Sequence, residues 1–164
     1  MKTMKIISIL LVLCALCCSF IACEDTGDAG NSALPERDFY EVTVSFQIKS
    51  ADGKTQIEAL DYKYKGHAEP TILTVVKSYL TVVAEWTCKV DKSNTITQIG
   101  GMKTRTGDYF GFVKCKRDAS GNITMSALNM SLEQVKKNLN EGNMNDTVLS
   151  DGDEFTIILI QSQE

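Results

Sequence analysis

Histidine is scarce in this chain, which has one in 164 residues. That residue, His67, lies in no G-x-S-x-G context, so the sequence does not indicate a Ser-His-Asp hydrolase. Two downstream cysteines and one histidine show no zinc-ligand spacing. A glycine-rich phosphate loop and a long basic run are also missing, and the formal net charge is −4. We therefore expect no catalytic residues, no metal, no cofactor and no nucleic-acid partner.

The first 22 residues have the pattern of a secretory signal peptide, with Lys2 and Lys5 before an apolar run at residues 6–22. The run ends in F-I-A-C at residues 20–23. This ending resembles the bacterial lipobox, in which the cysteine receives lipid and becomes the new N-terminus. The resemblance implies lipidation of Cys23 and attachment to a membrane of the cell envelope, in particular the outer membrane of a Gram-negative bacterium. A plain signal anchor and a cleaved signal without lipid are the alternatives.

Residues 23–38 are rich in glycine, aspartate and serine, with little to bury, so we expect a flexible tether. Its first part carries Glu24, Asp25 and Asp28. An acidic tract directly after a lipidated cysteine resembles the surface-export signal of some Gram-negative lipoproteins. The domain that follows would then face either the outside of the cell or the periplasm.

Six cysteines are present, and three of them fall in the signal peptide. Apart from Cys23, the remaining two are Cys88 and Cys115, both in expected strands. A location outside the cytoplasm permits a disulfide between them if their strands are neighbours. Two buried free thiols that behave as small apolar side chains are the alternative.

The domain begins with a hairpin. Apolar and polar residues alternate over residues 40–48, which predicts a half-buried strand. Asp52-Gly53 is a strong hairpin signal, and a return strand follows at residues 55–65. The parity of the apolar residues changes near Ala59, which indicates a bulge or register change there.

A helix should follow at residues 70–83, where apolar residues recur at helical spacing after Pro70. The content of β-branched residues is high, so a strand is the alternative. Short strands are expected at residues 85–90 and 95–99, with the single tryptophan, Trp86, as a core anchor. Gly100-Gly101 then marks a bulge or tight bend.

An aromatic strand is predicted at residues 109–116. Ser131 and Gln134 fit a capping box, which predicts a short second helix at residues 131–140. A continuous apolar run at residues 154–161 predicts a central strand that is covered on both faces. The fold class is therefore α+β, a β-grasp-like mixed sheet with one main packed helix and a second short helix.

Residues 39–161 resemble a domain family of unknown function that is similar to the C-terminal domain of transcobalamin. The resemblance rests on the helix from Pro70, on I-T-Q-I-G-G at residues 96–101, on Tyr109-Phe110, and on L-S-D-G-D at residues 149–153. In transcobalamin this domain helps to clasp cobalamin. The resemblance therefore implies a corrinoid or another planar ligand.

The same resemblance implies that Gly100, Gly101, Tyr109 and Phe110 lie near the ligand. Glycines allow close backbone approach, and aromatic faces stack on planar rings. The alternative is that the glycines form a bulge and the aromatic residues belong to the core. Because Tyr109 and Phe110 are adjacent, they point to opposite faces of a strand. We expect Phe110 and Phe112 in the core, and Tyr109 toward a groove rimmed by Gly100-Gly101.

These patterns favour a non-catalytic, membrane-anchored lipoprotein that binds a small molecule or a glycan. A structural or accessory protein that binds another envelope protein, through a sheet edge, is the alternative. Asp151 and Asp153 have the spacing of a turn rather than that of a catalytic carboxylate pair or a calcium loop.

Overall fold

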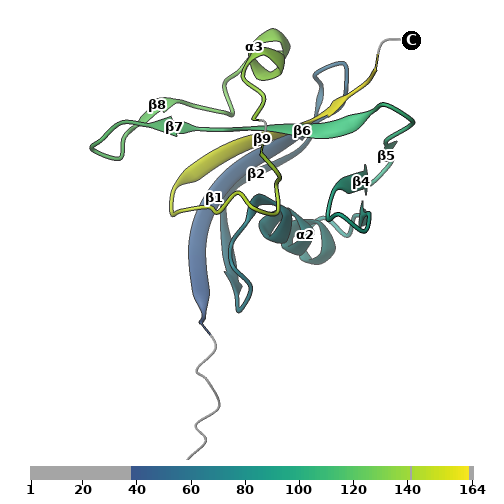
Figure 1. Ribbon diagram of the computed structural model, residues 1–164. Coiled ribbons are helices and arrows are strands. Elements are labelled where there is room, and N and C mark those ends of the chain that lie inside the picture. The colour runs from purple at the N-terminus through teal and green to yellow at the C-terminus, as the bar shows by residue number, and fades with distance from the viewer. Residues whose placement is uncertain (1–37, 141, 163–164) are drawn as a thin grey trace, which may run out of the picture. The chain divides into compact units, whose positions relative to one another are not determined.

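The computed structural model describes residues 38–140 and 142–162 (Figure 1). The predictions for the signal peptide, for Cys23 and for nearly all of the tether lie outside the described residues. Among the described residues, no helix is both long enough and apolar enough to cross a membrane.

A four-stranded mixed sheet forms the centre of the domain. Its strands are β1 (Tyr40–Lys49), β2 (Thr55–Gly66), β6 (Tyr109–Lys114) and β9 (Asp153–Ile160). The order across the sheet is β2-β1-β9-β6, with β1 and β9 parallel in the middle and the outer pairs antiparallel. This arrangement confirms the α+β, β-grasp-like fold and the central position of the last strand. It also makes β6 an edge strand.

The predicted register change in the first hairpin is confirmed. Val44 pairs with Tyr62, but Phe46 pairs with Ala59, so two residues of β2, Leu60 and Asp61, lie opposite the single residue Ser45 of β1. One of them, Asp61, adopts a positive φ of 51° and its N–H donates to Ser45 Oγ at 3.0 Å. The bulge brings Ala59 and Tyr64 into the same core although their positions differ in parity.

Helix α2 (Ile72–Val82) covers one face of the sheet (Figure 1). It begins two residues later than predicted, because Thr71 is the N-cap and accepts from Thr74 N–H, while Pro70 precedes the cap. Its buried face packs on Phe46 and Phe155, which are stacked with ring centroids 4.8 Å apart. A three-stranded sheet of β3 (Cys88–Val90), β4 (Ile96–Ile99) and β5 (Met102–Lys103) completes this side.

The other face carries a hairpin and a short helix. The hairpin consists of β7 (Lys116–Arg117) and β8 (Ile123–Met125), and the helix is α3 (Leu132–Lys137). The predicted capping box is present, since Ser131 and Gln134 bond reciprocally. Between hairpin and helix, the carbonyls of Ala127 and Leu128 accept from Thr156 Oγ1 and Gln47 Nε2, each at 2.6 Å. These bonds hold the segment against the sheet.

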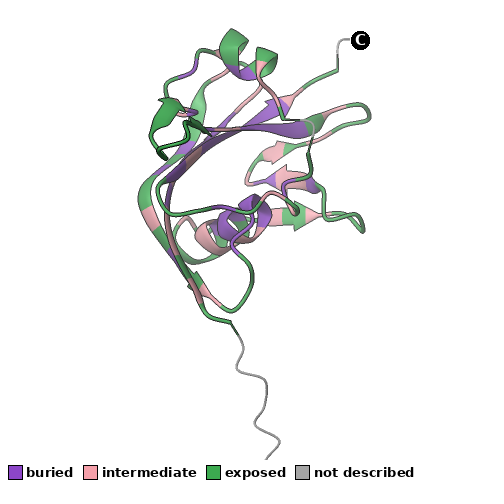
Figure 2. Ribbon diagram, turned by 60° about the vertical axis from the view of Figure 1, so that its left-hand side comes forward, coloured by how far each residue is buried: buried purple, intermediate pink, exposed green. Residues whose placement is uncertain are grey.

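Two hydrophobic cores result, one on each face of the sheet. Figure 2 shows the buried residues on the central strands and on the side of α2 that faces them. Alternate residues of β9 contribute side chains to the two cores. Phe155, Ile157 and Leu159 belong to the core on the α2 side, and Ile158 belongs to the core on the α3 side. All members of both cores lie between residues 40 and 160.

Candidate functional site

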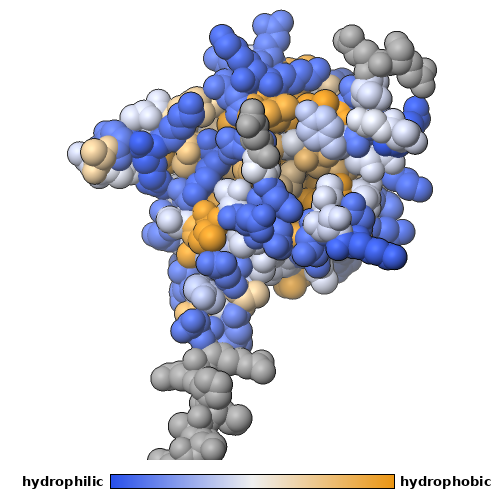
Figure 3. All heavy atoms as spheres, viewed as in Figure 1, coloured by the Kyte–Doolittle hydropathy of each residue, from blue (hydrophilic) through white to orange (hydrophobic). Residues whose placement is uncertain are grey.

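A pocket of about 440 Å³ lies along the outer edge of β6. Three segments line it: residues 109–112 of β6, residues 94–96 at the start of β4, and residues 139, 140 and 142–144 after α3. Figure 3 shows this region as an apolar hollow bordered by polar side chains. Its volume is within the range of ordinary ligand sites, which measure about 300–1,000 Å³.

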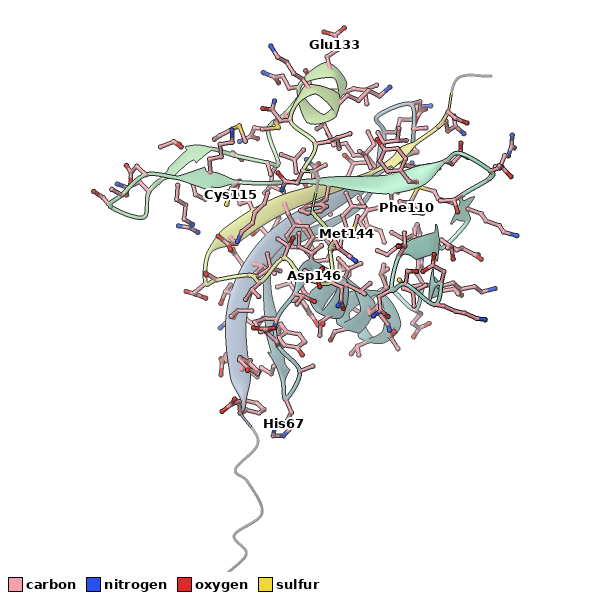
Figure 4. All side chains as sticks on the ribbon, viewed as in Figure 1. His67, Phe110, Cys115, Glu133, Met144 and Asp146 are labelled. Carbon is pink, nitrogen blue, oxygen red and sulfur yellow. The ribbon has the colours of Figure 1, made fainter. Side chains whose placement is uncertain are left out.

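The loop after α3 is held in place by the N-terminus of α2. Ile72 and Leu73 N–H donate to the carbonyls of Thr147 (3.1 Å) and Met144 (3.2 Å), and Leu149 N–H donates to Pro70 C=O at 2.8 Å. The loop thus satisfies first-turn donors that a helix cannot satisfy internally. Figure 4 shows Met144 on this loop and Phe110 on β6. The anchored loop forms one wall of the pocket.

None of the described residues that line the pocket is charged. Phe110, Phe112, Ile96 and Met144 supply buried apolar surface, whereas asparagine side chains supply the polar part. An asparagine amide can both donate and accept a hydrogen bond. The pocket is therefore suited to an uncharged ligand with polar groups at its margin and apolar groups inside.

Two of the four predicted site residues lie in this pocket. Phe110 is 5% exposed and belongs with Phe112 to the core on the α2 side, as expected. Tyr109 is 47% exposed and lies beside Gly111 on the opposite face. The prediction that the two adjacent rings divide between the core and an open face is confirmed.

Gly100 and Gly101 do not line the pocket, so the expected glycine rim is wrong. Gly100 has a φ of 53°, and a Cβ there would lie 2.5 Å from Trp86 Cε3. The glycine is therefore needed for a left-handed turn against the tryptophan ring. A Cβ on Gly101 would meet no heavy atom within 4 Å. The alternative, in which the glycines form a bend of the backbone, therefore accounts for Gly100, whereas no contact requires a glycine at position 101.

Sequence reasoning missed both the turn at residues 94–96 and the loop at residues 139–144. Asn94 gave a weak signal, since an asparagine in a turn often adopts a positive φ, as it does here at 58°. The loop gave none, because its position depends on hydrogen bonds to a helix about 70 positions earlier in the sequence.

The two aspartates of the D-G-D turn have structural partners. Asp151 Oδ1 accepts from Thr43 N–H at 2.8 Å. Asp153 is buried, with Lys114 Nζ at 2.7 Å and Arg117 Nε at 3.1 Å. Burial acts to raise the pKa of Asp153, but Lys114, the N–H of Ser150 and Arg117 outweigh it, so the pKa lies below its usual value. This carboxylate ties β6 and β7 to the turn before β9.

The disulfide that the sequence permitted is not formed, because Cys88 and Cys115 are both free thiols. Cys88 lies in the three-stranded sheet, whereas Cys115 follows β6 in the four-stranded sheet, so their strands are not neighbours. Burial raises the pKa of both thiols. They are the free thiols of the alternative, but Cys88 is only half-buried, and Cys115 Sγ donates to Asp153 Oδ1 at 3.6 Å and accepts from Glu154 N–H at 3.3 Å.

His67 is remote from the pocket, near the start of β1 (Figure 4). Its Nδ1 is hydrogen bonded with Asp38 C=O at 3.2 Å, and its ring packs edge-on to Phe39. Within residues 38–140 and 142–162, no group of three or more His, Cys, Asp or Glu side chains could hold a metal ion.

No family model and no curated protein matches this chain. Among solved structures, it is similar to one described as a "putative metal binding protein from Ruminococcus gnavus ATCC 29149". The two share 13% sequence identity, and the match covers 75% of this chain and 100% of the other, with a TM-score of 0.38. This likeness is too distant to inform the function.

Proposed function

We propose that this protein is a lipid-anchored, non-catalytic binding protein of the bacterial cell envelope, and that the pocket along β6 is its binding site. The observation that carries the proposal is the half-apolar lining of the pocket, whose described residues are all uncharged, with the half-exposed ring of Tyr109 at its margin. The ligand class that fits is an uncharged small molecule or a glycan. A corrinoid remains in this class through the resemblance to the transcobalamin-like domain.

A thermal-shift screen tests the binding site. The chain after Cys23 is screened against neutral small molecules, glycans and cobalamin, and each hit is measured again on Tyr109→Ala. Phe39→Ala is the matched control, since Phe39 is an aromatic residue that is 60% exposed and lies outside the pocket. We expect the shift to be lost in Tyr109→Ala and kept in Phe39→Ala. Equal behaviour of the two variants would place the binding site elsewhere.

The anchor is tested separately with the cysteines of the leader. Metabolic labelling with a fatty-acid analogue should mark the wild-type chain, and Cys23→Ser should lose the label. Cys18→Ser is the matched control, because bulky Cys17 precedes it and the lipobox does not use it. Undiminished label in Cys23→Ser, or equal loss in both variants, would reject lipidation at Cys23.

A second candidate function is that of an accessory protein that binds another envelope protein. The position of β6 at the edge of the sheet, with the pocket along its free side, favours this candidate. A photo-crosslinking residue at position 109 or 39, introduced in living cells, tests it. A protein adduct formed only from position 109 favours the accessory role, and its absence from both positions argues against it.

A further inference from the structure

The hydrogen-bonding direction of each residue in β6 can be assigned. Cys115 N–H, directly after the strand, donates to Glu154 C=O of the neighbouring chain segment at 2.8 Å. In an antiparallel pair such residues alternate with residues whose backbone groups point away from the partner. Gly111 and Val113 therefore bond to β9, whereas Phe110 and Phe112 direct their N–H and C=O toward the pocket.

One of these outward groups is already used. Asn140 N–H, in the loop after α3, donates to Phe112 C=O at 2.9 Å. The chain's own loop thus pairs with one end of the edge. Within the described part of the chain, no hydrogen bond reaches the N–H of Phe112 or either backbone group of Phe110. A donor and an acceptor on the same residue, facing one way, are what a strand offers to a further strand.

We propose that the pocket binds an extended, uncharged peptide segment of a partner protein, which adds as a strand beside β6 and pairs with Phe110. This inference rests on the β6 pocket as the binding site and on the second candidate function, in which the pocket receives another protein, and it names the segment that binds. In an antiparallel arrangement, one residue of the peptide exchanges both of its main-chain hydrogen bonds with Phe110. The free edge of β6 ends at Phe112, because Asn140 already bonds to the carbonyl of that residue, so the added strand is short. The described lining residues carry no charge, so a charged side chain at the paired position would lose its hydration among them without gaining an ion-pair partner.

A peptide strand that pairs with Phe110 donates one main-chain N–H to its carbonyl, and this supplies a test that a small-molecule site cannot imitate. Seven-residue peptides, acetylated and amidated at their ends and free of charged side chains, are screened as a library against the chain after Cys23. The best binder is then resynthesised with one N-methyl group at each position in turn, which removes a single N–H. Methylation should weaken binding at least about tenfold at one position, the residue whose N–H donates to Phe110 C=O, and much less at the positions beside it.

Amide hydrogen exchange by NMR then locates the peptide. Bound peptide should slow the exchange of the Phe110 and Phe112 N–H groups. The N–H groups of Gly111 and Val113, which already bond to β9, are the internal controls and should change little. Protection confined to the two phenylalanine amides would support the added strand.

Three outcomes would overturn the inference. They are a library without any binder to the folded domain, an N-methyl scan in which no single position stands out, and a bound peptide that leaves both phenylalanine amides unprotected. A neutral small molecule or glycan that shifts Tyr109 resonances without protecting these amides would keep the proposed binding site and reject the peptide. A peptide that protects only amides outside the pocket would reject both.

Discussion

Truncation of Phe110 and of Tyr109 should have different consequences although the two residues are adjacent. Phe110 is 5% exposed in the core under α2, and a buried Phe→Ala change costs about 3–5 kcal/mol. Because Phe110 also lines the pocket, the space left behind joins a pocket that water can enter, so we expect about 3 kcal/mol. Tyr109 is 47% exposed, so about half of the transfer free energy of a buried ring is lost, about 1 kcal/mol.

Urea denaturation of the two variants and of Phe112→Ala measures these differences. Phe112 is 2% exposed on the same face as Phe110, so its truncation is the reference for a fully structural ring. We expect the midpoints of Phe110→Ala and Phe112→Ala to fall together, with unchanged slopes, while Tyr109→Ala stays near the wild type. If Tyr109→Ala lost as much stability as Phe110→Ala, Tyr109 would be a structural ring, and the pocket would lose its aromatic margin.

Three further predictions concern the ends of the sheet and the thiols. Asp153→Asn should lower the free energy of unfolding by about 2 kcal/mol at neutral pH. Asp151→Asn should lower it by less than about 0.5 kcal/mol. The pKa of Asp153 is lower in the native chain than in the unfolded chain. Its stabilisation of the fold is therefore complete above the unfolded pKa near 4, and it is lost as the pH falls through the native pKa. In Asp153→Asn, the free energy of unfolding should lack this dependence on pH. In thermal denaturation, Gly100→Ala should lower the free energy of unfolding by about 1–3 kcal/mol, whereas Gly101→Ala should leave it nearly unchanged. Equal effects of the two substitutions would contradict the positive-φ turn at Gly100. Both domain thiols should react with iodoacetamide slowly in the native chain and fully after denaturation without reductant, as mass spectrometry would show; protection after denaturation would demonstrate a disulfide.

The main elements were predictable because each is coded locally. The alternation in β1, the helical spacing in α2 and the apolar run in β9 each reflect the surface that the element buries. The bulge in β2 followed from a change of parity, and the capping box of α3 from two residues. Helix ends were less accurate. Predicted residues 131–140 contract to Leu132–Lys137, because tertiary contacts decide where a short helix stops.

The candidate site was only half predictable. Parity along one strand was sufficient to separate Phe110 from Tyr109, because it is a local property. Gly100-Gly101 was misassigned, because a glycine suits either a close ligand or a left-handed turn, and only the packing of Trp86 decides between them. The loop wall at residues 139–144 depends on contacts between distant parts of the chain, which no short motif encodes.

The most direct test of the β6 pocket as the binding site is an NMR fragment screen on the labelled domain. Matched neutral and anionic fragment sets are titrated, and amide shifts are mapped on the structure. We predict that neutral fragments shift the amides of Asn94, Tyr109 and Asn140, and that anionic fragments do so much less, because the described lining residues offer no positive charge. Neutral fragments that leave these amides unmoved, or that gather at another face of the domain, would contradict the account.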